Sequence, residues 1–282
     1  MERPSVTAIL PNYNYSDFFP SRLEEILTQT YPVSEVIILD DASTDNSVAV
    51  INRELKKQRK AHPDVEFLFI KNEKNSGNVF LQWRKGVIEA SSELIWIAEL
   101  DDSCVEDFLE TAVAPFEKNK KAVLSYTGSK LVGDVKKRDK LRQKYDILRK
   151  KHLPGKYIAS GKRELNKNLA IFNSIPNVSA CVFKNIPELP KILGGAKNYK
   201  LCGDWFFYTK LAEKGKIAYS PEKLNLHRLS SDSVTSNTSL EDRYKEIKRV
   251  HSEAVLANDL RPSTLRKIEK LEKKLKRKWR LS

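Results

Sequence analysis

The stretch ELIWIAELDDSC, residues 93–104, joins an apolar run directly to three carboxylates. The run Leu94–Ala98 is typical of a strand buried in a sheet, where removing apolar surface from water is stabilising. Glu99, Asp101 and Asp102 instead require water, a cation or a shared proton, because ionised carboxylates this close repel one another. Both requirements are met if the run lies in the core and the acids lie where the strand leaves it.

The same pattern occurs upstream in EVIILDDASTDNS, residues 35–47, where an apolar run ends at Asp40 and Asp41. SVTAIL (5–10), which we expect to break at Pro11, and VEFLFIKN (65–72) are further predicted strands. These strands are apolar throughout rather than alternating, which is typical of a mostly parallel α/β sheet covered on both faces. Predicted helices separate them at 20–31, 47–62 and 78–91.

The acids therefore follow strands of one predicted parallel sheet. In open α/β sheets, ligands bind at the carboxyl ends of the strands. The sequence thus predicts a binding site formed by the residues after 35–39 and 94–98.

The second half of the chain is less regular. A polar, basic segment at 133–163 is predicted to be loop plus helix, and the chain is expected to be helical from Leu240 onward, with Pro262 in the first turn of a final helix. Other predicted elements are a strand in 173–185, a helix in 204–215 and one or two short strands in 216–230.

The composition bounds the class of protein. With 282 residues, 40% of them apolar, the chain can bury one large domain or two smaller ones. The N-terminus carries no long apolar segment, so we expect no secretory signal, and no run approaches the ~18 apolar residues of a membrane span. Cys104, Cys181 and Cys202 have no metal or disulfide spacing and are predicted to be reduced thiols of a cytoplasmic protein.

The net charge of +14 is concentrated in two segments. Residues 133–163 carry twelve Lys or Arg and three Asp, and residues 265–282 carry nine Lys or Arg and two Glu. Since these excesses of +9 and +7 exceed the whole net charge, the remainder is slightly acidic. Basic segments beside such a body indicate an anionic partner: a phosphate-bearing substrate, an acidic lipid or a nucleic acid.

Each acidic motif has more than one interpretation when taken alone. Glu99, Asp101 and Asp102 could hold a divalent cation, because Mg²⁺ typically binds one or two carboxylates together with substrate phosphates and water. Alternatively, Asp102 or Ser103 could cap the next helix.

Asp40 and Asp41 could accept hydrogen bonds from a ribose or a base, or Asp45 or Ser47 could cap the next helix. A pair of acids at a strand end also suits a phosphoacceptor domain.

The turn after the first predicted strand, Pro11-Asn12-Tyr13-Asn14, is likewise ambiguous. Its aromatic ring could form a wall for a planar base, or the segment could be an ordinary Pro-Asn turn.

The combination of motifs is far more specific than any one of them. The segments TAILPNYN, QTYPVSEVIILDDASTDNS, NSGNVFLQWRKGVIEAS and ELIWIAELDD occur in the order seen in family-2 glycosyltransferases, and the chain resembles that family. IPNVSACVFK and LCGDWFFYTKLAEKGKIAY extend the resemblance to about residues 4–235.

The resemblance implies a GT-A fold, which is a Rossmann-like, mostly parallel sheet flanked by helices, here with a C-terminal helical extension. It implies a glycosyltransferase domain over 1–238, divided into a nucleotide-sugar-binding half (1–130) and an acceptor-binding half (131–238), followed by a basic amphipathic extension over 239–282.

The family's motifs also imply roles for individual residues. Asp101 would be the main ligand of Mn²⁺ or Mg²⁺, Asp102 would assist, and Asp204 would be the catalytic base of an inverting transfer. Pro11 and Tyr13 would line the nucleobase pocket. The residues implied in nucleotide-sugar binding are Pro11, Tyr13, Asn14, Asp40, Asp41, Gly77, Glu99, Asp101 and Asp102.

Two positions depart from the family's pattern. Glu99 stands where Asp is usual, so we expect it to reach ribose rather than metal. By register Ser230 takes the place of the family's His, and His227 lies three residues earlier, so His227 is either a contact to metal or diphosphate or a strand-end residue. These departures leave open a catalytically impaired nucleotide- or glycan-binding module as the alternative function.

The resemblance further implies a UDP or dTDP sugar as donor and a glycan or lipid-linked glycan, of a cell-surface polysaccharide such as O-antigen, as acceptor. The final helix, 261–282, has a basic face and Trp279, a pattern typical of helices on an anionic membrane surface. It could instead pack on its own domain or in a dimer. No nucleic-acid-binding motif is present, so we expect no nucleic-acid partner.

Overall fold

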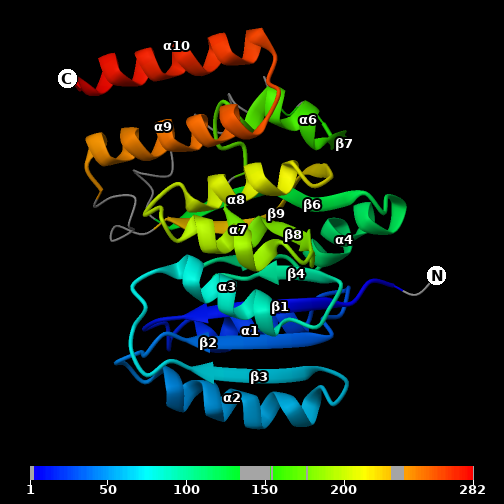
Figure 1. Ribbon diagram of the computed structural model, residues 1–282. Helices are drawn as coiled ribbons and strands as arrows, with labels where there is room; N and C mark the ends of the chain where they lie inside the picture. The colour runs from blue at the N-terminus through cyan, green and yellow to red at the C-terminus, as the bar shows by residue number, and fades with distance from the viewer. Residues whose placement is uncertain (1–2, 134–152, 154, 176, 230–237, 282) are drawn as a thin grey trace.

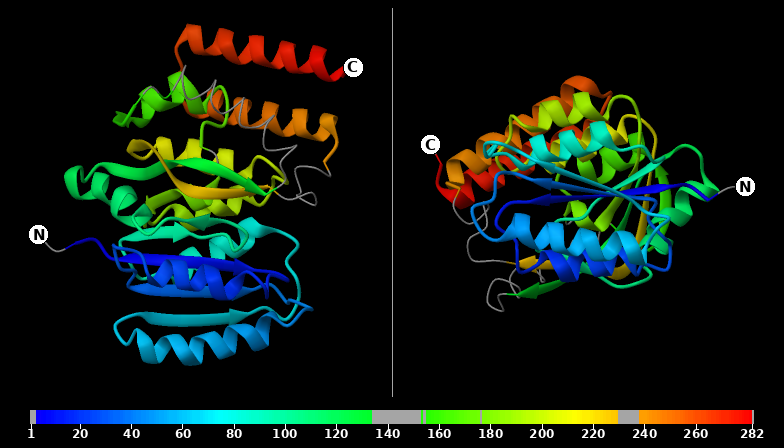
Figure 2. Two further views of the ribbon diagram at one scale, coloured as in Figure 1. Left: turned by 180° about the vertical axis from the view of Figure 1, so that it is seen from behind. Right: turned by 90° about the horizontal axis from the view of Figure 1, so that it is seen from below.

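The computed structural model describes residues 3–133, 153, 155–175, 177–229 and 238–281 (Figure 1). A nine-stranded sheet runs through the molecule with helices on both faces (Figures 1 and 2). Most of the basic segment predicted at 133–163, and Ser230, lie outside the described residues. In the described part of the chain no helix has the length and apolar character to cross a bilayer.

The N-terminal half forms the parallel part of the sheet, in the order β3-β2-β1-β4. Its strands are β1 (Val6–Asn12), β2 (Glu35–Asp40), β3 (Glu66–Lys71) and β4 (Leu94–Ile97). Its helices are α1 (Phe19–Leu27), α2 (Ser47–Ala61) and α3 (Val79–Glu89). The expected strand–helix alternation of this half is confirmed.

Successive residues of the central strands serve two separate cores, because side chains alternate between the faces of a sheet. Ile9 and Ile37 pack with Trp83 of α3 on one face. Ala8 and Ile38 pack toward α1, α2 and α4 on the other. Burial on both faces is the physical reason that these strands are apolar throughout.

The prediction that the first strand breaks at Pro11 is wrong. Pro11 pairs with Leu39 and the strand continues to Asn12. On the other side, β4 pairs with β1 only as far as Ile9, whose carbonyl accepts the last bond, from Ala98 N at 2.8 Å. Beyond that point no neighbour requires the N–H that proline lacks, so the strand passes through it without a lost ladder bond.

The second half continues the sheet as β4-β8-β6-β9-β5, with β7 paired to β9. Here antiparallel pairs (β4–β8, β8–β6, β9–β5, β9–β7) accompany the parallel pair β6–β9. The strands are β5 (Ser103–Cys104), β6 (Ala122–Gly133), β7 (Tyr157–Ser160), β8 (Cys181–Lys184) and β9 (Lys216–Leu229). The helices are α4 (Phe108–Lys118), α6 (Gly161–Glu164), η1 (Leu165–Leu169), η2 (Val178–Ala180), α7 (Leu189–Ala196) and α8 (Gly203–Ala212).

The one or two short strands predicted at 216–230 are a single long strand, β9. It follows β6 along its length and accommodates Pro221 where the register shifts between Thr127 and Gly128. A side chain at Gly128 would meet the Pro221 carbonyl at 2.8 Å, so the glycine allows the two backbones to approach at the irregularity.

The C-terminal extension consists of α9 (Leu240–Ala257) and α10 (Pro262–Trp279), which lie one above the other at one end of the sheet (Figure 1). Val250 and Ile268 belong to the same apolar core as the sheet residues. Between the helices, His251 Nδ1 lies 2.8 Å from Glu272 Oε1, and its Nε2 lies 3.0 Å from the Ile171 carbonyl. Ile268 and, in part, Leu271 of α10 are thus packed on the protein itself, whereas Leu265 is exposed.

Candidate active site

The acid loop, residues 99–102, begins two residues after β4 ends. Its backbone is held by Arg22, a buried residue of α1 whose Nε donates to the Glu99 carbonyl at 3.2 Å. Asp102 N closes the turn on the same carbonyl at 3.3 Å. The apolar run therefore anchors the acids at the carboxyl end of the sheet, as expected.

The Glu99 side chain is directed toward α3. Trp83 Nε1 donates to Glu99 Oε1 at 2.8 Å, and Ser179 Oγ accepts from Glu99 N at 3.1 Å. Burial, reinforced by the charge of Asp101, raises the pKa of Glu99 to about 8. Glu99 is therefore mostly protonated at neutral pH and is hydrogen-bonded to an indole.

Asp101 is the carboxylate of this loop that the protein leaves available. It accepts no side-chain hydrogen bond from any other residue that the structure describes, although its carbonyl accepts from Arg228 Nε at 2.9 Å. Burial and the neighbouring Asp102 raise the pKa of Asp101 to about 6. An oxygen-binding cation would relieve this repulsion.

Both carboxylate oxygens of Asp102, in contrast, accept hydrogen bonds from the protein. Its Oδ1 accepts from Arg228 N at 3.0 Å, and its Oδ2 accepts from Asn177 Nδ2. Asn177 is held in turn by Asn225 Nδ2 at 3.0 Å. Asp102 therefore ties the acid loop to β9 and to the segment before η2.

His227, next to these residues on β9, has a buried Nδ1 with no hydrogen-bond partner among the described residues. Burial lowers the pKa of this imidazole, against the opposing effect of Asp102, so the ring is neutral at neutral pH. A neutral, unpartnered ring nitrogen is a competent metal or hydrogen-bond ligand.

The residues present fit a divalent metal that is completed by substrate. No group of three His, Cys, Asp or Glu side chains suited to a metal is found in the part of the chain that the structure describes. Asp101 supplies one free carboxylate beside Asp102, and Mg²⁺ commonly takes one or two carboxylates together with substrate phosphates and water.

The predicted nucleotide residues Asp40 and Asn14 bind the turn after β2. Asp40 Oδ1 accepts from Asn12 Nδ2 at 2.7 Å and its Oδ2 accepts from Ser43 N at 3.1 Å. Asn14, with a left-handed φ of 60°, accepts from Thr44 N at 2.8 Å. These bonds join the ends of β1 and β2 into one rigid rim.

Asp41 holds the loop that contains Gly77. Its Oδ1 accepts from Ser76 N at 2.9 Å and from Gln82 Nε2 at 2.9 Å, and its Oδ2 accepts from Ser76 Oγ at 2.7 Å. Gly77 follows with φ of 63°, a conformation that side chains disfavour. Asp41 therefore makes its hydrogen bonds within the protein and fixes the loop that contains Gly77.

Two aromatic residues lie after β1. Tyr13 is 45% exposed, so nearly half of its surface is open to solvent. Tyr15, which the sequence did not single out, lies close enough to the acid loop that Asp101 and Glu99 add to the effect of burial in raising its pKa. Tyr15 therefore remains neutral at neutral pH, within electrostatic range of the acids.

Asp204 lies in the first turn of α8. Its Oδ1 accepts from Trp205 N at 2.6 Å and its Oδ2 from Asn173 Nδ2 at 3.1 Å. Burial raises the pKa of Asp204 to about 6 against the effect of these bonds. The charges of both Asp204 and Glu99 contribute to raising the pKa of the buried Tyr208, so the two carboxyls share one region of the protein.

Residues 173–175 and 177–179 contact three of these acids, Glu99, Asp102 and Asp204, and sequence reasoning missed their part. Asn173 donates to Asp204, Asn177 donates to Asp102, and Ser179 accepts from Glu99 N. The signal in the sequence was the two amides and two hydroxyls of NSIPNVS, at the start of a segment, 173–185, predicted only as a strand.

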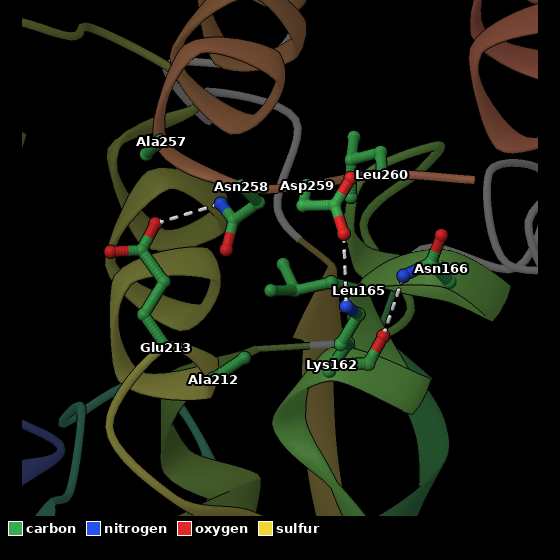
Figure 3. Close-up of a pocket in the computed structure, with 9 residues that line it drawn as sticks. All are labelled: Lys162, Leu165, Asn166, Ala212, Glu213, Ala257, Asn258, Asp259 and Leu260. Carbon is green, nitrogen blue, oxygen red and sulfur yellow. Dashed lines mark hydrogen bonds and ion pairs between the residues drawn. The ribbon is translucent and has the colours of Figure 1, made fainter. Parts of the chain in front are cut away.

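A separate pocket of about 240 Å³ lies where α6 and α8 meet the link between α9 and α10 (Figure 3). Its polar residues already pair with each other: Lys162 Nζ with Asp259 at 3.1 Å, and Asn258 Nδ2 with Glu213 at 3.0 Å. None of the predicted site residues lines it. We therefore locate the candidate active site at the acid loop and not in this pocket.

Solved structures share this architecture. Staphylococcus aureus TarS, residues 1–349, in complex with UDP-GlcNAc superimposes with a TM-score of 0.67 at 18% identity, over 94% of this chain and 70% of that one. The Pyrobaculum calidifontis mannosyltransferase PcManGT in complex with GDP-Man and Mn²⁺ gives 0.66 at 19% identity, over 98% and 70%. The fold is GT-A, as the resemblance implied.

Sequence comparisons give the family. The chain is 25% identical over 255 residues to the Bacillus subtilis protein named as a teichuronic acid biosynthesis glycosyltransferase, TuaG, covering 88% of this chain and 90% of that one. It is 28% identical over 106 residues to the Streptococcus pneumoniae glycosyltransferase GlyG, covering 38% and 33%. The family description Glycosyl transferase family 2 matches residues 7–174, which is more than half of the chain. The chain is a glycosyltransferase and belongs to glycosyl transferase family 2.

Proposed function

We propose that this glycosyltransferase moves a sugar from a nucleoside diphosphate sugar to a hydroxyl group of a glycan acceptor, with inversion at the anomeric carbon. The observation that carries the proposal is the pair of differently engaged carboxylates. Asp101 is available for a metal, while Asp204 is fixed by two hydrogen bonds and has a pKa raised to about 6. Two carboxyls with separate environments suit two separate roles.

The donor would bind at the carboxyl ends of β1, β2 and β4. Pro11 and the exposed ring of Tyr13 would flank the base, and the rim fixed by Asp40 would present the ribose contacts. Gly77 would let backbone approach the nucleotide. TarS has been solved with UDP and with UDP-GlcNAc, which supports a uridine nucleotide, with dTDP as the related choice.

Mn²⁺ or Mg²⁺ would be held by Asp101, with Asp102 adjacent and the neutral imidazole of His227 nearby. When bound, such an ion supplies Lewis-acid stabilisation of the departing diphosphate. The protein's own part is to hold Asp102 in place through Asn177 and the backbone of Arg228, so that the acid loop keeps its shape.

Asp204 would act as the general base. The acceptor oxygen forms a bond to the anomeric carbon as its proton passes to the Asp204 carboxylate, and the bond to the diphosphate breaks with its electron pair on the nucleotide. Above about pH 6 the carboxylate is ionised and able to take the proton, while its raised pKa makes it a better base than an exposed Asp. Attack opposite the leaving group gives inversion.

The acceptor would be a growing cell-surface polysaccharide or a lipid-linked glycan. The name of the Bacillus subtilis relative, which refers to teichuronic acid biosynthesis, supports a polysaccharide. We place the transferase unit at 1–238, with 239–282 as an extension that completes its core.

An acceptor of this kind suits a protein of the cytoplasm that is held at the inner membrane face. The basic side chains of α10 are exposed, while Ile268 on its other face is buried. Binding to an anionic bilayer would therefore depend on attraction between these basic side chains and the lipid headgroups, and not on insertion of the apolar face.

The proposal is tested by Asp204→Asn. We expect the variant to bind nucleotide sugar with wild-type affinity and to lose about 10²- to 10⁴-fold in transfer, the usual contribution of a general base. Transfer near the wild-type rate would show that the base is another residue. Donor binding without transfer by the wild-type protein, over a panel of acceptors, would favour the impaired binding module.

A further inference from the structure

The C-terminal helix α9 contacts the loop that leads into the Asp204 helix. Glu246 Oε1 accepts from Lys200 N at 2.7 Å, and Oε2 accepts from Leu201 N and Cys202 N, both at 2.8 Å. Three consecutive backbone N–H groups thus converge on one carboxylate. Charge-assisted hydrogen bonds of this kind are roughly twice as strong as neutral ones.

The bonded residues stand directly before the catalytic turn. Cys202 is the N-cap residue of α8, and Asp204 follows two positions later in its first turn. Glu246 thereby supplies the acceptor for three backbone N–H groups at the entry to α8, the last of them that of its N-cap residue. The same loop is held on its other side by Asn78 Nδ2, which donates to the Lys197 carbonyl at 2.8 Å.

The structure assigns Glu246 as a positioning residue for Asp204, supplied by the extension outside the sheet. The inference rests on the proposed role of Asp204 as general base. Glu246 fixes the turn that sets the direction of the Asp204 side chain. A displacement of ~1 Å at a catalytic group can reduce a rate by about 10²-fold, so this turn must be held.

Glu246 also contributes charge. The titratable groups near Asp204 on β8 and α8 are Cys181 and Tyr208, and burial raises the pKa of both, so they are uncharged at neutral pH. Cys202, before α8, is neutral for the same reason. Glu246 is the acidic group that adds to burial in raising the pKa of Asp204.

The test uses three variants of the full chain on α9. Glu246→Gln removes the charge and at least one backbone bond. Glu246→Asp keeps the charge but shortens the arm. Glu241→Gln is the matched control, since Glu241 is exposed on the same helix and pairs only with Lys245, at 2.8 Å, among the described residues.

For Glu246→Gln we expect a 10- to 100-fold lower plateau of kcat/KM, about the cost of a displaced group, and an acid limb moved to lower pH. Glu246→Asp should lower the plateau and leave the limb in place, and Glu241→Gln should change neither. A profile for Glu246→Gln that has the wild-type limb, with or without a uniform loss of activity, overturns the inference.

The Asp204 carboxyl can also be titrated without turnover, by NMR of protein labelled with ¹³C-aspartate, its signal being identified by its loss in Asp204→Asn. A lower midpoint in Glu246→Gln supports the inference even if Asp204→Asn remains active and the proposed base is wrong. An unchanged midpoint overturns it even if the base is right.

Discussion

Asn173 Nδ2 donates a hydrogen bond of 3.1 Å to Asp204 Oδ2, across 31 residues of sequence. This bond favours the ionised carboxylate, whereas burial and the charge of Glu246 favour the protonated form. Burial outweighs the lowering effects of the backbone N–H of Trp205 and of Asn173, and with the smaller effect of Glu246 it raises the pKa of Asp204 to about 6. Asn173 and Glu246 therefore act on the same carboxyl in opposite directions.

Replacing Asn173 with Ala should move the acid limb of the kcat/KM profile upward, because the ionised carboxylate of Asp204 loses a donor. The shift is opposite in sign to that expected for Glu246→Gln. Profiles between pH 5 and 8 with saturating metal would measure it. A limb that stays at the wild-type pH would show that Asn173 does not act on the titrating group.

The raised pKa of Asp204 also predicts a pH-dependent stability. Between its ordinary value of 3.8 and about 6, the unfolded chain has released this proton and the folded protein still holds it. The contribution of Asp204 to the free energy of unfolding is therefore fully present below pH 3.8 and is lost as the pH rises through 6.

Asp204→Asn removes that loss and should stabilise the protein at pH 8 by at most about 3 kcal/mol, at ~1.4 kcal/mol per pKa unit, with little gain at pH 4. Urea unfolding at both pH values measures it. An equal change at pH 4 and pH 8 would contradict the raised pKa.

Asp101→Asn should weaken metal-dependent donor binding by more than tenfold, since the available carboxylate of the acid loop would be lost. Calorimetry with UDP-sugars, with and without Mn²⁺, provides the measurement. Asp107→Asn is the matched control, because Asp107 is exposed and makes no side-chain cap bond. If donor affinity is the same in both variants, the metal assignment is wrong.

Asn177→Ala should destabilise the fold and loosen the acid loop. It leaves buried Asp102 without the donor to Oδ2 and Asn225 Nδ2 without one of its acceptors. Leaving such groups unpaired costs about 1–3 kcal/mol, and more for a charged partner. Urea unfolding should show this loss, and donor affinity with Mn²⁺ should fall with it. Wild-type stability would show that this bond contributes nothing.

The exposed face of α10 should bind anionic membranes. Changing Lys267, Lys270 and Lys274 together to Gln should lower binding to vesicles with anionic lipid by about 100-fold, at ~1 kcal/mol per Lys. The matched control changes Lys56, Lys57 and Lys60 of α2, which lies at the opposite end of the sheet (Figure 1). Equal co-sedimentation of the two triple variants would argue against α10 as the contact.

The sequence alone determined the parallel half of the sheet and the position of the acids. Val36–Leu39 and Leu94–Ile97 are apolar on both faces, and such a pattern is local, so it can be read without knowing the partner strands. The strand that passes through Pro11 was mispredicted, because its tolerance depends on where β4 stops pairing. The continuous β9 was missed for a similar reason, its pairing with β6 across a register shift.

Only the tertiary structure decided how the acids differ from one another. Glu99, Asp101 and Asp102 are alike in sequence, yet one is bonded to Trp83, one is available, and one is bonded to Asn177. These two pairings join residues 16 and 75 positions apart, and no local periodicity encodes them. The sequence places carboxylates at the end of a strand; packing of α3, α8, α9 and residues 173–175 and 177–179 sets the environment of each.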